Sequence, residues 1–428
     1  MTQHKTIAVI LLGVGVGLFL YGGIGLLLSP SSWKFIQFMV GVALLFIGYV
    51  RLQDTQDAVK KASLSLFWIS VTLVTLEIIL RITTPQPKFE SRLPLYPHSN
   101  KLIEVSLDGI SSPTRYSTNS WGLRGDEPPE NWDDYLTIIT VGNSTTQNYY
   151  IDDNKNWPYL LQSSLRNTKD NDCIWIGNAG LDGHSTRGNL LLMEEVIRDI
   201  RPDVIIFLVG ANDLALSMSA HPPVDGNQFD AQELPFLFQS RLYRTVWQLK
   251  NIALKDVILT KNVHQNYEPI PVNEALLTPL PDDLLEMLPS LDIYRETIHQ
   301  LIDIGEELGI EMVFFTQPLL FEDSQEWESV QAKDFWIREQ GLVITGATWW
   351  KLLEIHNQTL LEVCEERGVH CYDLAAKIPH SREYFYDTVH FNDAGSALVS
   401  QAVFLSLQEV LDTSNNLLPD DTGNCITD

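Results

Sequence analysis

Short apolar runs alternate with helical patterns along most of the chain after residue 130, and this alternation constrains the fold more than any other feature. Five candidate strands lie at 136–141, 173–178, 204–209, 312–316 and 370–374, and the first and third are rich in β-branched residues. Apolar residues at helical spacing occupy the intervals, at about 157–166, 188–199, 293–308 and 348–367, and again after residue 392. This order is typical of a parallel sheet covered by helices on both faces. The sequence therefore predicts an α/β fold, a flavodoxin-like three-layer fold with a five-stranded parallel sheet.

The first run ends at Gly142 and is followed by Asn143 and Ser144. In open parallel sheets, ligands bind beyond the carboxyl ends of the strands, where loops and helix N-termini converge. A serine at that edge is a candidate nucleophile, although small polar residues after a strand also serve as ordinary turn residues. Ser144 is therefore the first candidate site residue.

Three later stretches favour the nucleophile. They are Asn178-Ala-Gly-Leu-Asp-Gly183, Gly210-Ala-Asn-Asp213 and Asp387-Thr-Val-His390, and the first two directly follow apolar runs. With these stretches the chain resembles the SGNH (GDSL-type) hydrolase superfamily, whose four blocks contribute Ser, Gly, Asn and His in that order. The resemblance covers about residues 115–412, and the ordered set of four is much more specific than any one block.

The resemblance implies a catalytic triad of Ser144, His390 and Asp387. A serine hydroxyl needs a base to remove its proton during attack, and His390 would be this base. Asp387 would hold one imidazole nitrogen while the other nitrogen faces the serine. The resemblance also implies an oxyanion hole formed by the backbone N–H groups of Ser144 and Gly183 and by the side-chain amide of Asn212. Taken singly, Gly183 is a turn glycine and Asn212 a cap at the end of a strand.

The chain departs from the superfamily in its serine block, which usually reads Gly-Asp-Ser or Gly-Gly-Ser and here contains Asn143. In the glycine block, His184 either contacts a bound substrate or, as we expect, is a solvent-facing loop residue. Membrane-anchored members of the superfamily often carry Asn-x-x-Gly-x-Arg ahead of the serine block, and Asn119, Gly122 and Arg124 match it. The expected role of this pattern is to pack the preceding linker against the catalytic domain.

Three apolar segments precede this region, at about residues 6–28, 35–50 and 64–82. The first and third are long enough to cross a hydrocarbon layer of roughly 30 Å, and the second needs its flanking Trp33 and Arg51 near the interfaces. Glu77 inside the third is costly in lipid, so it should face the other helices of this region. A cleaved signal peptide is the alternative for the first segment, but that segment is long and two more follow. We therefore expect a transmembrane region with three helices over residues 1–83.

Basic residues near short loops indicate the orientation of such helices. With the N-terminus inside, the short loop that carries Arg51, Lys60 and Lys61 is cytoplasmic, and everything after Arg81 lies on the outer face. We therefore expect a multi-pass protein of the cell membrane, anchored by its N-terminal helices, with the catalytic domain on the periplasmic or extracellular side.

The charge of the chain limits its partners. Residues 1–92 hold eight of the 29 Lys and Arg and four of the 55 Asp and Glu, which leaves the remainder with 21 basic and 51 acidic residues and a net charge of −30. So acidic a domain repels nucleic acid and anionic lipid surfaces. We expect neutral or cationic substrates and no nucleic-acid partner.

The four cysteines, Cys173, Cys364, Cys371 and Cys425, show neither paired C-x-x-C spacing nor a zinc-finger pattern. Cys364 and Cys371 lie seven residues apart across a predicted helix-to-strand turn, so an oxidising compartment would permit a disulfide. We prefer ordinary buried thiols. A metal cluster with His370 would lack further ligands nearby, and we expect neither a metal nor a cofactor.

The remaining segments complete the predicted domain order. Residues 84–130, with several prolines, are expected to form a linker and N-terminal extension, and residues 131–412 the hydrolase domain. An insertion at about 217–291 interrupts the α/β order and is a predicted place for specificity or a lid. The polar residues 413–428 are expected to be a disordered tail.

A second irregular segment, at 319–347, contains Trp327 and Trp336, and Trp349 and Trp350 follow directly. Aromatic rings near the carboxyl end of a strand can stack on a sugar ring, but such rings more often pack in the interior. We prefer packing as the role of these tryptophans.

The leading hypothesis for function is a membrane-anchored serine esterase that removes acyl groups, with O-acetyl groups as one candidate, from a cell-surface glycan or lipid. The first alternative is an O-acyltransferase with the same triad, in which a hydroxyl of a cell-surface polysaccharide intercepts the acyl-enzyme in place of water. A catalytically inactive glycan-binding module is the alternative of another class, and the intact set of site residues argues against it. The sequence does not separate hydrolysis from transfer.

Overall fold

The computed structural model describes residues 56–83, 93–169, 172–217, 240–253, 258–264, 279–321 and 344–413, together with isolated positions between 14 and 44. The chain divides into two compact units. The helical unit comprises Met1–Pro87 and Glu233–Ala253, and the α/β unit comprises Lys88–Gln232 and Leu254–Asp428. All five predicted strands belong to the α/β unit.

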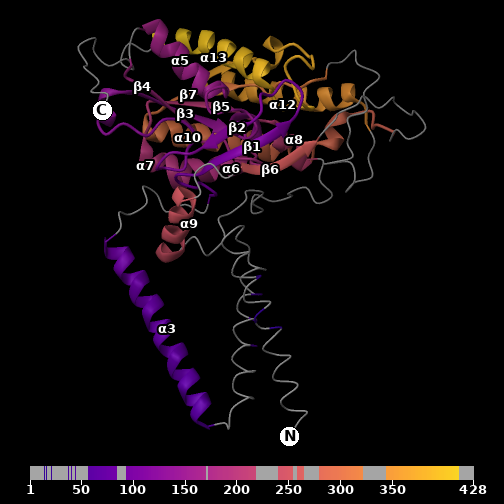
Figure 1. Ribbon diagram of the computed structural model, residues 1–428. Coiled ribbons are helices and arrows are strands. Elements are labelled where there is room, and N and C mark those ends of the chain that lie inside the picture. Colours follow the sequence, from indigo (N-terminus) through magenta and orange to yellow (C-terminus); the bar gives the residue numbers. More distant parts are fainter. Residues whose placement is uncertain are drawn as a thin grey trace. The chain divides into compact units, whose positions relative to one another are not determined.

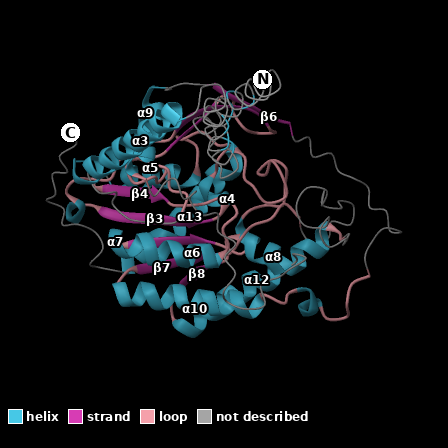
Figure 2. Ribbon diagram, turned by 90° about the horizontal axis from the view of Figure 1, so that it is seen from below, coloured by secondary structure: helices cyan, strands magenta, loops and turns pink. Residues whose placement is uncertain are grey.

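These five strands form one sheet. They are β3 (Leu136–Gly142), β4 (Ile174–Asn178), β5 (Val204–Leu208), β7 (Glu311–Phe315) and β8 (His370–Tyr372). Neighbouring strands are parallel and their order is β4-β3-β5-β7-β8, as Figure 2 shows. The predicted five-stranded parallel sheet is confirmed, and the order is that of a flavodoxin-like winding.

Helices cover both faces of this sheet (Figure 1). The main ones are α5 (Trp157–Lys169), α6 (Thr186–Leu192), α10 (Leu291–Leu308), α12 (Gly346–Arg367) and α13 (Asp393–Thr413). One core cluster joins α5 and α13 to the face of β3 that carries Ile138. The other joins α6 and α10 to the face that carries Ile139 and Val141, and α12 contributes to both clusters. Every residue of β3 is buried, because a central parallel strand is covered on both sides.

Short helical elements complete the α/β unit. They are α4 (Ser144–Gln147), α7 (Arg198–Ile200), α8 (Ala211–Ser217), a π-helical turn at Met193–Ile197, and 3-10 turns at Trp132–Asp134, Leu284–Met287 and Ala375–Lys377. The π-helical turn connects α6 directly to α7, so the predicted helix at 188–199 is a continuous helical segment.

A second sheet of three strands lies in the same unit and was not predicted. It consists of β2 (Thr114–Ser117), β1 (Asn100–Ser106) and β6 (Ile258–His264), in the order β2-β1-β6. β1 pairs antiparallel with β2 and parallel with β6, which comes from the insertion. Ile103, Val105 and Tyr116 form a separate buried cluster on this sheet. We call it the small sheet.

The helical unit contains α3 (Gln56–Thr83) and α9 (Arg241–Ala253). Glu77 of α3 accepts hydrogen bonds from the Ser240 hydroxyl and from the backbone N–H groups of Arg241 and Leu242, at 2.9–3.0 Å. It also accepts one from Arg81. Glu77 therefore faces α9, which is not one of the three predicted membrane segments, and it satisfies N–H groups at the start of α9 that have no partner within that helix.

The predicted transmembrane segments are covered only in part. The segments at 6–28 and 35–50 lie outside the described residues, apart from isolated positions, whereas the segment at 64–82 is helical within α3. Among the described residues, one helix, Asp393–Asp412, has the length and apolar composition needed to cross a membrane. It packs on the sheet through Val399 and Val403, as the core helix of a soluble domain does. The predicted disordered tail after residue 413 also lies outside the described residues.

Cys364 and Cys371 form a disulfide, so the expectation of buried thiols is wrong. Gly368 ends α12 with a φ of +66° and turns the chain into β8. This turn brings the two cysteine Cα atoms to 6.0 Å, which is within the usual range for a disulfide. Cys173 is disulfide-bonded as well.

Candidate functional site

Ser144 is the first residue of the one-turn helix α4, directly beyond the carboxyl end of β3. A Cβ at Gly142 would lie 2.3 Å from Thr146 Oγ1 and 2.5 Å from the Leu208 carbonyl oxygen, so the strand can end this close to its neighbours only with glycine. Asn143 caps α4, and its amide oxygen accepts hydrogen bonds from the N–H and the hydroxyl of Thr145, at 2.9 and 2.7 Å. An amide oxygen thus supplies the acceptor that the commoner aspartate would supply.

His390 lies between Ser144 and Asp387. Its Nε2 is 2.7 Å from Ser144 Oγ, and its Nδ1 is 2.6 Å from Asp387 Oδ2. A carboxylate can only accept, so Nδ1 carries the proton and Nε2 is left to accept from the serine hydroxyl. The other oxygen of Asp387 accepts from the backbone N–H groups of Val389 and His390, at 2.9 and 2.7 Å, which fixes the carboxylate in this turn.

The surroundings of His390 favour its protonated form. Burial by itself lowers the pKa of the imidazole, but the charge and hydrogen bond of Asp387, and the charge of Asp182, raise it, and the net pKa lies above the usual value. The side chain is 27 % exposed, so a molecule from solvent can reach it. Such an imidazole can accept the proton of a serine hydroxyl and hold the resulting charge.

The two remaining predicted site residues lie on neighbouring segments of the α/β unit. Gly183 has a φ of +77°, and a Cβ built there would have no atom within 4 Å, so its backbone borders open space. Asn212 is the second residue of α8, and its Nδ2 donates to the backbone oxygen of His184 at 3.0 Å. Asn212 is thus bonded to the loop that carries Gly183, and its amide has a second N–H.

His184 is buried, with 1 % of its surface exposed, so the expectation of a solvent-facing residue is wrong. The loop folds its ring against α6, where a Cβ at Gly188 would lie 2.7 Å from His184 Nδ1. Neither ring nitrogen has a hydrogen-bond partner among the described residues. Burial lowers the pKa of His184 to about 4, so the ring is neutral at ordinary pH.

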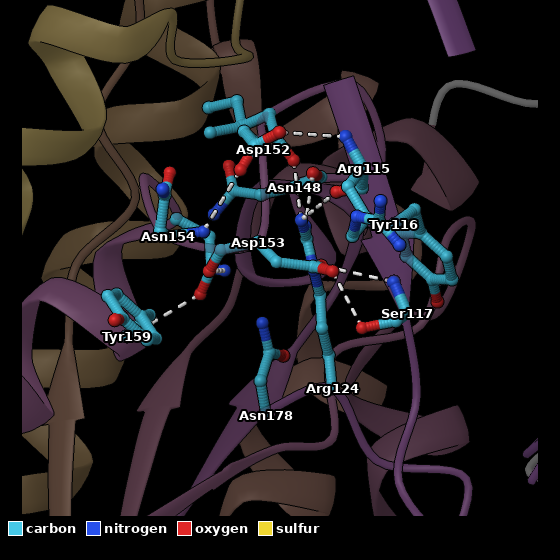
Figure 3. A network of polar contacts seen from close by, with 12 residues as sticks. Arg115, Tyr116, Ser117, Arg124, Asn148, Asp152, Asp153, Asn154, Tyr159 and Asn178 are labelled. Atoms are coloured by element: carbon cyan, nitrogen blue, oxygen red, sulfur yellow. Dashed lines mark hydrogen bonds and ion pairs between the residues drawn. The ribbon is translucent and has the colours of Figure 1, made fainter. Parts of the chain in front are cut away.

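A buried arginine supports the turn that follows the serine. Arg124 is 2 % exposed and donates from Nη1 to the carbonyl oxygens of Gln147, at 2.9 Å, and Asn148, at 2.6 Å. Its Nη2 donates to the carbonyl oxygen of Ile151, and its Nε donates to Asp153 at 2.9 Å. Figure 3 shows the side chain reaching between Asp153 and the segment of Arg115 towards Asn148.

The Asn-x-x-Gly-x-Arg pattern forms the turn that presents this arginine. The Asn119 side-chain oxygen accepts from the N–H groups of Trp121 and Leu123, and Gly122 has a φ of +81°. The backbone of Arg124 then exchanges two hydrogen bonds with Asn178 at the end of β4, at 2.8 and 2.9 Å. The pattern therefore joins the N-terminal extension to two segments of the site. One is the end of β4, which precedes Gly183, and the other is the turn that follows Ser144.

Sequence reasoning missed the aromatic residues beside the imidazole. Tyr386 stacks on His390 with ring centroids 5.4 Å apart and planes inclined by 5°. Tyr150 lies edge-on to Tyr386 at 6.4 Å. Their positions in the sequence could have indicated them, because Tyr386 directly precedes Asp387 and Tyr150 lies shortly after α4, the helix that begins at Ser144. Trp349, in contrast, is buried in the core as predicted, while Trp327 and Trp336 lie outside the described residues.

Within the part of the chain that the structure describes, no group of three or more His, Cys, Asp or Glu side chains is arranged to hold a metal ion. The chemistry available at the carboxyl edge of the sheet is that of a hydroxyl, an imidazole, a carboxylate and backbone or amide N–H groups.

Comparison with known proteins agrees with this chemistry. Residues 140–335 match the GDSL-like Lipase/Acylhydrolase family, a range that includes Ser144, Gly183 and Asn212 and ends before Asp387 and His390. No curated protein matches.

Solved structures with a similar fold include three hydrolases. An acetylxylan esterase from Geobacillus stearothermophilus has 12 % identity and a TM-score of 0.36, over 64 % of this chain and 94 % of its own. A psychrotrophic esterase from Pseudoalteromonas sp. has 11 % identity and a TM-score of 0.37, over 65 % and 99 %. An α/β hydrolase enzyme from the metagenome of Lake Arreo has 13 % identity and a TM-score of 0.36, over 64 % and 95 %. On the family match, the chain carries a GDSL-like lipase/acylhydrolase domain and is a hydrolase that acts on ester bonds.

Proposed function

We propose that the chain is a membrane-anchored serine esterase that cleaves acyl esters of a cell-surface glycan or lipid, with Ser144, His390 and Asp387 as its catalytic triad. The main support is the continuous hydrogen-bonded series from Ser144 Oγ through both nitrogens of His390 to Asp387, at 2.7 and 2.6 Å. These are the contacts that activation of a serine hydroxyl requires.

In the first step, Ser144 Oγ attacks the carbonyl carbon of the ester and its proton passes to Nε2 of His390. Asp387 stabilises the imidazolium that forms and keeps the ring in the correct orientation. The negative charge that develops on the carbonyl oxygen is stabilised by the N–H groups of Ser144 and Gly183 and by the second N–H of Asn212. The positive φ of Gly183 and the open space beside it are consistent with this role.

When the intermediate collapses, the bond between the carbonyl carbon and the alcohol oxygen breaks, and His390 gives its proton to that oxygen. The acyl group is left on Ser144. His390 then takes a proton from a water molecule as the water oxygen attacks the acyl carbon. When the bond between that carbon and Ser144 Oγ breaks, His390 gives the proton to Ser144 Oγ and the carboxylic acid leaves. His390 thus acts first as base and then as acid in each half of the reaction.

Two further observations support the membrane and the outer face as the location. α3 has 28 residues, a length of about 42 Å, and it exposes Trp68, Ile69 and Val74 along most of its apolar part. The disulfide between Cys364 and Cys371 fits an oxidising compartment. The net charge of −30 after residue 92 favours neutral or cationic substrates over anionic ones.

Substitution of the proposed nucleophile tests the function. Full-length chain with Ser144→Ala should lose turnover of a chromogenic acetyl ester and should no longer be labelled by a fluorophosphonate probe. Ser163→Ala is the matched control, since that hydroxyl donates to a helix carbonyl on α5 and should be neutral for both readouts. Unchanged hydrolysis by folded Ser144→Ala protein would remove Ser144 from its role.

A further inference from the structure

A row of aromatic side chains leads from the small sheet to the candidate base. The ring centroids of Tyr116 and Tyr149 are 4.8 Å apart, those of Tyr149 and Tyr150 are 5.2 Å apart, and those of Tyr150 and Tyr386 are 6.4 Å apart. Tyr386 then stacks on the imidazole of His390. We call these four tyrosines the tyrosine row. It ends on the imidazole that is hydrogen-bonded to the nucleophile.

One side of the tyrosine row packs on the small sheet, and the row is partly exposed to solvent. Tyr149, Tyr150 and Tyr386 pack against the buried cluster of the small sheet, which includes Ile103. Lys101 Nζ donates to the hydroxyl of Tyr149 at 3.3 Å and lies 4.9 Å from the centre of its ring. These three tyrosines nevertheless remain partly exposed. Rings that are held in place but not covered can bind a ligand at little cost in conformational entropy.

A carboxylate lies at the same edge of the site. Asp182 is exposed and directly precedes Gly183. Gly183 borders open space, so the loop that carries Asp182 lines the open part of the site. Burial raises the pKa of Tyr150 and the charge of Asp182 adds to that shift, as it does to the raised pKa of His390.

The chemistry of ester cleavage determines which half of the substrate meets these groups. His390 gives its proton to the leaving oxygen, so the alcohol half of the ester must lie within hydrogen-bond distance of Nε2. The carbonyl oxygen points instead towards the N–H groups of Gly183 and Asn212. Side chains beside His390 are therefore expected to contact the alcohol half of the substrate. Tyr386 stacks on the imidazole, and Tyr150 is the next ring along the tyrosine row.

The properties of this surface favour a polyhydroxylated alcohol. Tyrosine offers an apolar ring face together with a polar hydroxyl, which suits a ring whose faces carry C–H groups and whose rim carries hydroxyls. Asp182 adds an acceptor for hydroxyl donors, and it repels an alcohol that carries a phosphate. A purely aliphatic alcohol has no hydroxyl groups beyond the ester oxygen and could not donate a hydrogen bond to this carboxylate.

We propose that Tyr150, Tyr386 and Asp182 form the binding site for the alcohol half of the ester, and that this alcohol is a sugar. The inference rests on the proposed role of His390 as the group that protonates the leaving alcohol. It names the substrate class within the proposed esterase function, because the acyl group is then carried by a glycan.

The experiment compares three acetyl esters, so that only the alcohol varies. They are ethyl acetate, a mono-O-acetylated methyl glycoside, and acetylcholine as a cationic alcohol. Full-length wild type, Tyr150→Ala and Asp182→Asn are assayed on each. Tyr135→Ala is the control, because Tyr135 is a partly exposed tyrosine at the opposite end of β3. Tyr386 is left intact, since it supports the imidazole.

Tyr150→Ala is expected to raise KM for the acetylated glycoside by about fivefold to tenfold, the effect of one lost aromatic contact, and to lower kcat/KM for the glycoside more than kcat/KM for ethyl acetate. Asp182→Asn should also raise KM for the glycoside. Equal losses on all three esters would overturn the binding role of Tyr150, as would no loss on the glycoside. A wild-type preference for acetylcholine that Asp182→Asn removes would overturn the sugar and indicate a cationic alcohol.

The same assays distinguish failure of the esterase function from failure of the sugar site alone. Wild-type chain that hydrolyses none of the three esters and is not labelled by a fluorophosphonate would refute the esterase itself, and the sugar site with it. Wild-type chain that hydrolyses all three, with Tyr150→Ala indistinguishable from it, would refute only the sugar site.

Discussion

Arg124 donates a hydrogen bond of 2.6 Å to the carbonyl oxygen of Asn148, the residue that ends the one-turn helix begun by Ser144. Asn148 has a φ of 52°, so the chain reverses sharply there. A helix of four residues has almost no stability of its own, and its last carbonyl groups need partners from outside it. The Arg124 guanidinium donates hydrogen bonds to the carbonyl oxygens of Gln147 and Asn148 at the end of the helix, and to that of Ile151 just beyond it.

We therefore expect Arg124→Lys to slow catalysis. A lysine ammonium cannot reproduce the planar set of donors that the guanidinium directs to these carbonyls and to Asp153. The turn should shift, and a displacement of the nucleophile of about 1 Å lowers kcat by roughly tenfold to a hundredfold with little change in KM. The measurement is kcat, KM and the rate of fluorophosphonate labelling, well below the melting temperature.

Arg166→Lys is the control for lost stability. Arg166 also donates to a strand carbonyl, that of Ile174, and pairs with Asp126, but it lies on α5 away from the serine turn. It should lower the melting temperature without changing kcat. If Arg124→Lys behaved in the same way, Arg124 would have only a structural role.

Asn212→Ala should lower kcat by roughly 10²–10³-fold with little change in KM, because the proposed hydrogen bond strengthens only as the oxyanion forms. Asn212→Asp should be at least as damaging, since a carboxylate would face the developing negative charge. Both changes also remove the bond to the His184 carbonyl oxygen, which costs about 1 kcal/mol of stability.

Thr137→Val is the control for stability loss without loss of an oxyanion donor. Thr137 is buried at the end of β3 opposite Ser144, and its hydroxyl exchanges hydrogen bonds with Asp203, so its loss should lower stability and leave kcat near normal. Near-normal kcat in the folded fraction of Asn212→Ala would show that Asn212 merely holds the loop.

The pH profile should have an acid limb set by His390. The imidazole must be neutral to accept the serine proton, and its pKa is raised above the usual value. kcat/KM should therefore fall as the pH drops through that raised pKa. Asp182→Asn removes one of the charges that favour the imidazolium, so the acid limb should move to lower pH.

Asp172→Asn serves as the comparison for this shift. Asp172 is exposed just before the start of β4, at the far edge of the sheet from Ser144. Its substitution changes the net charge equally but should not move the limb. An acid limb that moves equally in both variants would refute a local effect of Asp182.

The proposed topology predicts that protease added to intact spheroplasts digests the chain after residue 92. Three helices that start from an inside N-terminus leave the catalytic region on the outer face. The measurement is immunoblotting of a C-terminal tag, with a cytoplasmic protein as the control for lysis. Complete protection of the tag in sealed cells, and its loss after lysis, would reverse the orientation.

The main sheet could be predicted because four of its strands are buried apolar runs with β-branched residues, and β8 follows a long helical pattern as the α/β order requires. Predicted and observed strand ends differ by at most two residues. The small sheet could not be predicted in the same way. β1 and β6 carry polar residues among their apolar ones and pair across more than 150 positions, so nothing local indicates their partnership. Their pairing is a tertiary contact.

In the candidate site, too, some features could be predicted from the sequence and others could not. The order of motifs predicts that Ser144, Asp387 and His390 lie together, and the structure brings them within hydrogen-bond distance. The catalytic role of each stays a proposal. The burial of His184 depends on the space that Gly188 leaves on the next helix, and the contacts of Arg124 depend on the path of the chain from Gln147 to Ile151. Neither is encoded by local sequence.

The small sheet also determines where the catalytic part of the chain can be cut. A fragment that began at residue 131 would contain every motif residue from Ser144 to His390, yet it would lack Arg124 and Tyr116 and would leave the carbonyls of Gln147 and Asn148 without their donor. A fragment that begins near Lys88, the first residue of the α/β unit, keeps both. We therefore expect the smallest active fragment to be longer than the motifs suggest, because it needs Arg124 as well as the motif residues.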